Sequence, residues 1–356
     1  MTHLERFQNE LKKTGAVALV SSHANIFYLC GFSFHDGYLL IFPENAYLLT
    51  DSRYSEAAGM YADKGFSVLA PTGGMLAEIR DLLGAHGAEK LLVEEDNLTV
   101  ATHDRLVEKL APVTLAKGAT AILKELRICK DAGEIAAIRE AQRITDAAFA
   151  HILGFIRPGV RELDVALELE FFMRKNGAGD IAFDTIAVSG SASALPHGEP
   201  RDRVLEKGFL TMDFGARYGG YCADMTRTVV IGKADAEMKR LYRTVLTAQE
   251  AALDMIGEGL FCSAIDKVAR DIIDKSGYAG CFGHSLGHGV GIDIHEAPRL
   301  SAKAGDAVLA RGHVVTVEPG IYLAGQYGCR IEDLVVIGEN GKVENLTVSP
   351  KELLEL

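Results

Sequence analysis

The strongest constraint on the fold lies in the second part of the chain, where two pairs of helical segments alternate with strand-like segments. Asp131 and Glu134 have the spacing of a capping box, and apolar residues then recur at helical spacing. Helices are predicted at about 131–156, 161–176, 235–257 and 263–275, and strands at 183–188, 209–216, 221–232 and 313–323. This order indicates a duplicated α+β unit, although no internal sequence repeat is apparent.

The first part of the chain has the pattern of an α/β domain. Short apolar segments with β-branched residues predict strands, and the segments between them predict helices. The strands are expected at 15–22, 38–42, 46–51 and 91–95, and the helices at 74–86 and 99–110. Because 356 residues are many for one domain, we expect an α/β domain at 1–125 and an α+β domain at 126–356.

The charge balance disfavours several kinds of partner. The 49 acidic residues outnumber the 37 basic ones and give a net charge of −12, which argues against binding to nucleic acid or to a membrane surface. No apolar run reaches the ~18 residues that span a bilayer, and the polar N-terminal segment lacks the apolar core of a signal peptide. Six cysteines without a CxxC pair indicate reduced thiols in a cytoplasmic protein.

Two aspartates flank a glycine-rich turn in the second domain. Asp213 and Asp224 lie in strand-like segments, and a tight hairpin between them would bring both carboxylates to one face of a sheet. Two negative charges at that distance repel each other unless a cation lies between them. Exposed aspartates on a surface hairpin are the simpler alternative, but the apolar neighbours Met212 and Phe214 favour a buried site.

Two histidines follow in a second glycine-rich segment. His284 and His288 are four residues apart, but the glycines around them oppose a helix. We therefore expect a loop in which one histidine is a metal ligand and the other supports it. A nucleotide-binding loop is disfavoured, because neither of the glycine-rich nucleotide motifs is complete here.

Two glutamates complete the set of acidic residues in apolar surroundings. Glu318 is expected at the end of a strand, and Glu332 lies in a strand-like segment where an unpaired carboxylate would be costly to bury. Together, four carboxylates and one imidazole suit two divalent cations of intermediate hardness, such as Mn²⁺, Co²⁺, Fe²⁺ or Zn²⁺. Two such cations about 3.5–4 Å apart are the usual arrangement for metal-assisted hydrolysis.

Several separated motifs of the chain resemble those of one family of enzymes. The segments DFGARYGGYCADMTRT, GHSLGHGVGIDIHEAPRLS, TVEPGIY and RIEDLVVI, in this order, resemble the pita-bread metallopeptidases, and more narrowly their prolidase and Xaa-Pro aminopeptidase branch. The segments SHANIFYLCGF and TDSRYSEAA resemble the creatinase-type N-terminal domain of that branch. The resemblance implies a creatinase-like α/β domain followed by a duplicated α+β pita-bread catalytic domain.

The resemblance implies a role for each candidate ligand. Asp213 would bind one metal ion, and Asp224 and Glu332 would bridge two ions. The second ion would be completed by His288 and Glu318, with a hydroxide between the ions as the nucleophile and Glu318 as general base and acid. Two further histidines match residues that contact the substrate in the family, namely His197 and His295.

A further group of residues is implied less directly. His284 matches an additional histidine of the Xaa-Pro branch, and His35 lies in a loop that can approach the active site of the partner subunit in dimeric members. Arg299 and Arg330 could bind a substrate carboxylate or support the ligands, with a structural ion pair as the alternative. Tyr221 could support the site or belong to the core.

The resemblance implies a cytoplasmic, homodimeric exopeptidase that removes the N-terminal residue from peptides with proline in the second position. Dipeptides (prolidase) and longer peptides (Xaa-Pro aminopeptidase) both remain open as substrates. A methionine aminopeptidase is disfavoured by His284 and by the N-terminal domain, and a metal-free creatinase by the four clustered carboxylates. A non-catalytic pita-bread binding protein is disfavoured because all five predicted ligands are present.

Overall fold

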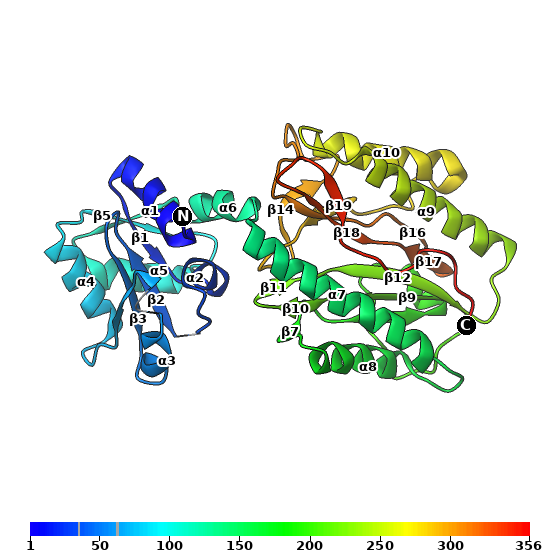
Figure 1. The fold of residues 1–356 in the computed structure, drawn as a ribbon, viewed down its shortest axis with the longest axis horizontal. Helices are drawn as coiled ribbons and strands as arrows, with labels where there is room; N and C mark the ends of the chain where they lie inside the picture. The colour runs from blue at the N-terminus through cyan, green and yellow to red at the C-terminus, as the bar shows by residue number, and fades with distance from the viewer. Residues whose placement is uncertain (35, 62–63) are drawn as a thin grey trace. The chain divides into compact units, whose positions relative to one another are not determined.

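The computed structural model describes residues 1–34, 36–61 and 64–356, which form two compact units, Met1–Arg127 and Ile128–Leu356 (Figure 1). The prediction for His35 lies outside the described residues. Among the helices that the structure describes, none has a stretch long and apolar enough to cross a membrane. All six cysteines are free thiols, as the sequence predicts.

The first unit is an α/β domain built on one mixed sheet. Its elements are α1 (His3–Thr14), β1 (Val17–Val20), α2 (His23–Cys30), β2 (Gly37–Ile41), β3 (Ala46–Thr50), α3 (Ser55–Gly59), β4 (Ser67–Leu69), α4 (Met75–Ala85), β5 (Lys90–Val93), α5 (Val100–Leu110), β6 (Thr114–Lys117) and α6 (Ala119–Ile128). The six strands are ordered β4-β3-β2-β1-β5-β6, and β2 is antiparallel to both of its neighbours, β1 and β3. Leucine, isoleucine and valine side chains from the sheet, α4 and α5 form the core of this unit.

The second unit contains two helix pairs and their strands. The first half has α7 (Ala132–Phe155), α8 (Glu162–Lys175), β7 (Asp180–Ile181), β8 (Ile186–Ser189), the 3₁₀ helix η2 (Gly190–Ala194), β9 (Gly208–Phe214), β10 (Ala216–Tyr218), β11 (Tyr221–Cys222) and β12 (Met225–Ile231). The second half has α9 (Ala236–Met255), α10 (Cys262–Ile273), the π-helical turn η3 (Asp274–Tyr278), β13 (Gly287–Gly289), β14 (Glu296–Leu300), β15 (Val314–Val317), β16 (Gly320–Leu323), β17 (Tyr327–Arg330), β18 (Asp333–Ile337) and β19 (Val343–Asn345).

The two halves repeat one arrangement with an offset of one hundred residues through the helix pairs. Ile156 and Ile256 are the C-caps of α7 and α9, and each is followed three residues later by a glycine with positive φ. The ladder formed by β8, β9 and β12 in the first half corresponds to the ladder formed by β13, β15 and β18 in the second half. The duplication predicted from the order of elements is therefore present, although few residue identities are shared.

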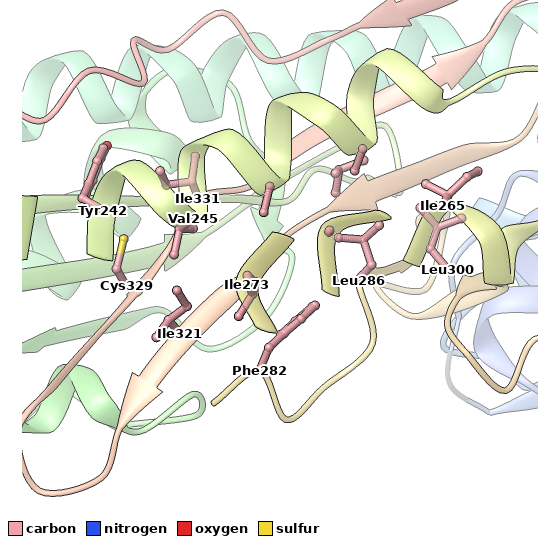
Figure 2. Close-up of a cluster of buried hydrophobic side chains, with 14 of the residues drawn as sticks. Tyr242, Val245, Ile265, Ile273, Phe282, Leu286, Leu300, Ile321, Cys329 and Ile331 are labelled. Carbon is pink, nitrogen blue, oxygen red and sulfur yellow. The ribbon is translucent and has the colours of Figure 1, made fainter. Parts of the chain in front are cut away.

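Each helix pair packs on the strands of its own half. One apolar core joins α7 and α8 to β8, β9 and β12. A second core joins α9 and α10 to the strands that follow them, and Figure 2 shows Tyr242 and Val245 of α9 and Ile265 and Ile273 of α10 within it. The two ladders meet where the backbone N–H of Glu332 donates to the carbonyl of Thr226 at 3.1 Å. This junction places the polar ends of both ladders side by side.

Candidate metal centre

The five predicted metal ligands lie in one pocket of the second unit. Asp213, Asp224, His288, Glu318 and Glu332 all line a cavity of about 440 Å³, which we call the acidic pocket. His197, His284, His295, Arg299 and Arg330 line the same cavity. Asp224, His288 and Glu332 offer ligand atoms that lie within 4.8 Å of one another. Residues from both repeated halves thus converge on one site.

The duplicated ladders explain how the carboxylates reach the pocket. Asp224 immediately precedes β12 in the first half, and Glu332 immediately precedes β18 in the second. Asp213 is the penultimate residue of β9 and is the cross-strand partner of Thr226. Glu318 directly follows β15, at the strand end where the sequence predicts it. Each half therefore contributes two carboxylates from equivalent places in its ladder.

The expectation that His288 lies in a loop is wrong, because it lies in the short strand β13. The flanking glycines serve close packing of strands rather than a flexible loop. A Cβ on Gly287 would lie 2.0 Å from the carbonyl oxygen of Thr316, and one on Gly289 would lie 2.2 Å from that of Ala297. Only glycine permits this approach, so the glycine pair holds the strand and its histidine against β14 and β15.

The surroundings of His288 direct one ring nitrogen at the carboxylates. Nδ1 lies 3.1 Å from the carbonyl of Gly289, which places its hydrogen there and leaves Nε2 as the acceptor. Nε2 lies 3.5 Å from Asp224 Oδ2 and 3.4 Å from Glu318 Oε1. Burial lowers the pKa of His288 to about 4, so the ring is neutral near pH 7. Three acceptor atoms therefore face one another.

Buried acceptors without donors show that the pocket fits cations. Within the described part of the chain, Asp213 Oδ1 and Glu332 Oε1 are buried and have no hydrogen-bond partner. Thr226 donates to the other oxygen of Glu332 at 2.6 Å, and Thr316 donates to Glu318 Oε1 at 3.2 Å. Such unpaired carboxylate oxygens are costly unless a positive charge lies among them. The donor set of four carboxylates and a neutral imidazole suits divalent metal ions.

The carboxylates also perturb one another's ionisation. Burial, reinforced by the charge of Glu332 and Asp213, raises the pKa of Asp224 well above its ordinary value. Burial raises the pKa of Glu318 to about 8, and burial with the charge of Glu318 raises that of Glu332 well above its usual range. Bound cations would reverse these shifts, because they favour the ionised carboxylates.

Arg330 links the pocket to two further side chains. Its Nη2 donates to Asp213 Oδ2 at 2.6 Å, and its Nη1 donates to the hydroxyl of Tyr322 at 2.7 Å. The hydroxyl lies 2.9 Å from Nε2 of His284, whose Nδ1 lies 2.9 Å from the carbonyl of Ser285. Both ring nitrogens of His284 are therefore occupied, which fits a supporting role. Sequence reasoning missed Tyr322, although its place four residues after Glu318 was an available signal.

The other predicted residues differ in their positions. His197, His295 and Arg299 are exposed at the pocket, and the rings of His295 and His288 are 4.4 Å apart between centroids. Arg299 is the cross-strand partner of His288, and no carboxylate of the described residues lies within 4 Å of its guanidinium. Tyr221 does not line the pocket, and its hydroxyl donates to Glu134 Oε1 at 3.0 Å.

The comparisons with known proteins agree in both units of the chain. Residues 136–339 match metallopeptidase family M24, and residues 3–129 match the creatinase/prolidase N-terminal domain. An uncharacterized peptidase of Bacillus subtilis is 41% identical over 355 residues, which cover 99% of each chain.

Solved structures give the same result. A structure titled Xaa-Pro dipeptidase from Bacillus anthracis is similar with a TM-score of 0.94 and 41% identity, covering 99% of each chain. An X-Pro aminopeptidase from Thermotoga maritima is similar with a TM-score of 0.90 and 38% identity, covering 96% of this chain and 98% of that one. The predicted creatinase-type domain followed by a pita-bread catalytic domain is confirmed. The chain is a metallopeptidase that belongs to family M24 and, within it, to the prolidase branch.

Proposed function

We propose that the protein is a metal-dependent exopeptidase that removes the N-terminal residue from peptides with proline in the second position. The observation that carries this is the acidic pocket, in which four carboxylates and a neutral histidine face one another with unpaired acceptor atoms. The two similar solved structures are titled as Xaa-Pro peptidases, which favours this substrate class over a methionine aminopeptidase or a non-catalytic binding protein.

The proposed cofactor is a pair of divalent cations, held by Asp213, Asp224, His288, Glu318 and Glu332. Mixed oxygen and nitrogen donors favour Mn²⁺, Co²⁺, Fe²⁺ or Zn²⁺ over Mg²⁺ and Ca²⁺. Arg330 supplies one buried positive charge against four carboxylates, so more than one further positive charge is needed to balance them. When bound, such cations polarise the scissile carbonyl and lower the pKa of a water molecule.

The side chains around the proposed cations are assigned proton transfer, substrate binding and ligand orientation. Glu318 is proposed to take a proton from the attacking water at Oε2 and to pass it to the departing proline nitrogen, because Thr316 already donates to Oε1. His197 and His295 are exposed at the pocket and are proposed to donate hydrogen bonds to the substrate carbonyl oxygen. Arg330 fixes Asp213 through a hydrogen bond at 2.6 Å and so orients one ligand.

Hydrolysis of short peptides tests the proposed function. With Mn²⁺ or Co²⁺ present, we expect cleavage of Ala-Pro or Ala-Pro-Ala at least about tenfold faster than of Ala-Ala, since the pocket then discriminates the second residue by the ~1–3 kcal/mol typical of such contacts. Released alanine is the readout, counted as two per bond cleaved for Ala-Ala and one per bond for the other two peptides. Absence of cleavage with all four metal ions would contradict the proposal.

Arg299 is the proposed anchor for the carboxylate of a dipeptide. Its guanidinium lines the acidic pocket without a carboxylate partner among the described residues, and it lies beside a metal ligand on the neighbouring strand. A dipeptide carboxylate would complete that missing pair, whereas a longer peptide carries its carboxylate farther away.

We expect Arg299→Gln to lower kcat/KM for Ala-Pro by about 10- to 100-fold, mainly through KM, and to affect Ala-Pro-Ala less. The lost charge-assisted hydrogen bonds correspond to about 1.5–3 kcal/mol. Lys303→Gln, which removes an exposed positive charge four residues later and outside the pocket lining, is the control. Equal losses for both substrates would indicate that Arg299 does not bind the terminal carboxylate.

The proposal includes a cytoplasmic homodimer. Six free cysteines support a reducing compartment. Sedimentation of the purified protein at several concentrations measures the oligomeric state, and a monomer throughout would contradict the dimer.

A further inference from the structure

A fully buried carboxylate outside the acidic pocket closes the loop that carries His197. Glu162, the first residue of α8, has an exposure of 0%. It accepts hydrogen bonds from the backbone N–H and the hydroxyl of Ser189 at 2.7 Å each, and from the backbone N–H of Arg201 at 3.0 Å. The Arg201 guanidinium adds two more, from Nε at 2.7 Å and from Nη2 at 2.5 Å.

This carboxylate is ionised at neutral pH despite its burial. Burial raises its pKa, but the hydrogen bonds from Arg201 and Ser189 outweigh that effect and hold the pKa below the usual value for glutamate. Five donors on one carboxylate make an arrangement in which both oxygens are satisfied. Glu162 therefore forms a rigid, charged connection rather than a single surface ion pair.

The two groups that Glu162 holds are the two ends of one loop. Ser189 ends β8, and Arg201 follows Pro200, so the segment 190–200 starts and finishes at the same carboxylate. Five consecutive residues of that segment line the acidic pocket, from Pro196 to Pro200, and His197 is among them. Between these ends, two hydrogen bonds from outside the segment hold it: Arg330 Nη1 donates to the carbonyl of Pro196 at 3.2 Å, and the backbone N–H of Gly328 donates to Ser193 Oγ at 3.0 Å.

We propose that Glu162 is a positioning residue for the reaction, which acts by holding the loop 190–200 so that His197 faces the acidic pocket. This rests on the proposed function, since it assumes that His197 contacts the substrate. Glu162 itself does not line the acidic pocket, and its carboxylate is engaged by Ser189 and Arg201.

The second half of the repeat contains a comparable device, which supports this reading of Glu162. Asp266 of α10 is also fully buried, and its Oδ1 accepts from the backbone N–H of Leu286 and from Arg270 Nη2. Arg270 in turn donates to the carbonyl of His284 at 2.9 Å. In each half, a buried acid on the second helix, paired with an arginine, thus holds a segment that carries a pocket histidine.

A double-mutant cycle distinguishes positioning through His197 from general support of the fold. We expect Glu162→Gln to lower kcat/KM for Xaa-Pro peptides by about 10- to 100-fold, the range found for residues that orient catalytic groups. In a His197→Ala background the same substitution should cause little further loss. Metal content should remain that of the wild type. An equal loss in both backgrounds would overturn the role of Glu162 through His197.

Amide hydrogen exchange provides a readout that does not depend on activity. Glu162→Gln should accelerate exchange at residues 190–200 by about tenfold or more, while the amides of β9 and β12 keep their protection. Unchanged exchange in this segment would overturn the inference. If exchange accelerates in Glu162→Gln but the wild type cleaves no Xaa-Pro peptide, both the proposed function and this role of Glu162 are wrong. If the wild type is active but the losses from Glu162→Gln and His197→Ala are additive, only this role of Glu162 is wrong.

Two further variants keep the test decisive. Arg201→Met removes the guanidinium that pairs with Glu162. The Arg201 side chain is one-third exposed, whereas Glu162 is fully buried, so this variant provides the same test if Glu162→Gln does not fold. It should show the same loss and the same lack of additivity with His197→Ala. Asp164→Asn is the matched control, because Asp164 lies in the same helical turn and pairs with Arg161 but does not touch Ser189 or Arg201.

Discussion

Replacing Glu332 with glutamine is expected to abolish cation binding and to lower kcat/KM for Xaa-Pro peptides by roughly 1,000-fold or more, since an effect of several kcal/mol on the transition state is at stake. Glu332 Oε1 is buried without a donor among the described residues, and Thr226 holds Oε2. The amide has nearly the same shape, but it is neutral and its nitrogen cannot be a ligand. The measurement is metal content after dialysis, together with peptide hydrolysis.

A matched control separates the loss of a ligand from the loss of a buried acid. Asp146 is 8% exposed and accepts from the backbone N–H of Ser349 at 2.8 Å, but it does not line the acidic pocket. Asp146→Asn should reduce the melting temperature and leave metal content unchanged. If Glu332→Gln retained its metal and its activity, Glu332 would not be a ligand.

Removal of the metal ions is expected to lower the melting temperature by about 5–10 °C. Free metal ion at about 100 times its Kd stabilises the folded state by about 2.7 kcal/mol, and each kcal/mol shifts the melting temperature of a unit of this size by about 2–4 °C. Calorimetry before and after treatment with a chelator measures the shift. A melting temperature unaffected by chelation would contradict a resident metal site.

Glu332→Gln should abolish this dependence of the melting temperature on metal ions. In the metal-free protein, the substitution removes one of four crowded carboxylates, so the variant is expected to melt at a higher temperature than metal-free wild type. Added Mn²⁺ or Co²⁺ should raise the melting temperature of the wild type only. Identical responses of the two proteins to the metal ions would show that the carboxylate is not needed for binding.

The same carboxylates make the stability of the metal-free protein depend on pH. The pKa of Glu318 is about 8 in the folded protein against an ordinary value of 4.5, so its protonated form stabilises the fold fully below pH 4.5 and this contribution disappears as the pH rises to 8. His284 and His288, with pKa values lowered from 6.5 to about 4, act in the opposite sense, but only below pH 6.5. Between pH 6.5 and 8 the carboxylates should therefore determine whether the stability of the metal-free protein rises or falls with pH.

We therefore expect the melting temperature of the chelated protein to fall as the pH is raised from 6.5 to 8. With metal ions bound, the carboxylates stay ionised and this dependence should largely disappear. A series of thermal melts at four pH values, with and without metal ions, is sufficient. A flat or rising profile for the chelated protein would contradict the raised carboxylate pKa values.

Local patterns predicted most helices and strands of the second unit. The capping box at Asp131 begins α7, and the predicted helix at 161–176 corresponds to α8 at Glu162–Lys175. In the first unit, α2 was not predicted. It has only eight residues, and its apolar residues, which include the neighbours Ile26 and Phe27, do not recur at helical spacing. The repeat was visible in the sequence as an order of elements, since the C-cap isoleucine and its following glycine recur but the ladder positions carry different side chains.

The sequence predicted the candidate site residues that lie in apolar, strand-like segments, but it did not predict the contacts that orient them. The four carboxylates and His288 stand out because charged groups are rarely placed among apolar residues without a partner. Glu162 could not be recognised in the same way, because its partners Ser189 and Arg201 are 27 and 39 residues away. The place of Tyr322 near Glu318 was a signal, but its contact with His284, 38 residues away, was not visible. Long-range hydrogen bonds have no signature in local sequence.

The duplicated ladders have a consequence for how binding and folding influence each other. Asp213 and Asp224 belong to the first half of the repeat, whereas His288, Glu318 and Glu332 belong to the second. A cation held by all of them is a cross-link between two segments of the chain. By thermodynamic reciprocity, the free energy with which a bound cation stabilises the packing of the two halves equals the free energy with which that packing strengthens cation binding. Substitutions that loosen this packing are therefore expected to weaken cation affinity. Cation affinity therefore reports on how well the two halves pack together, even when the substituted residue is remote from every ligand.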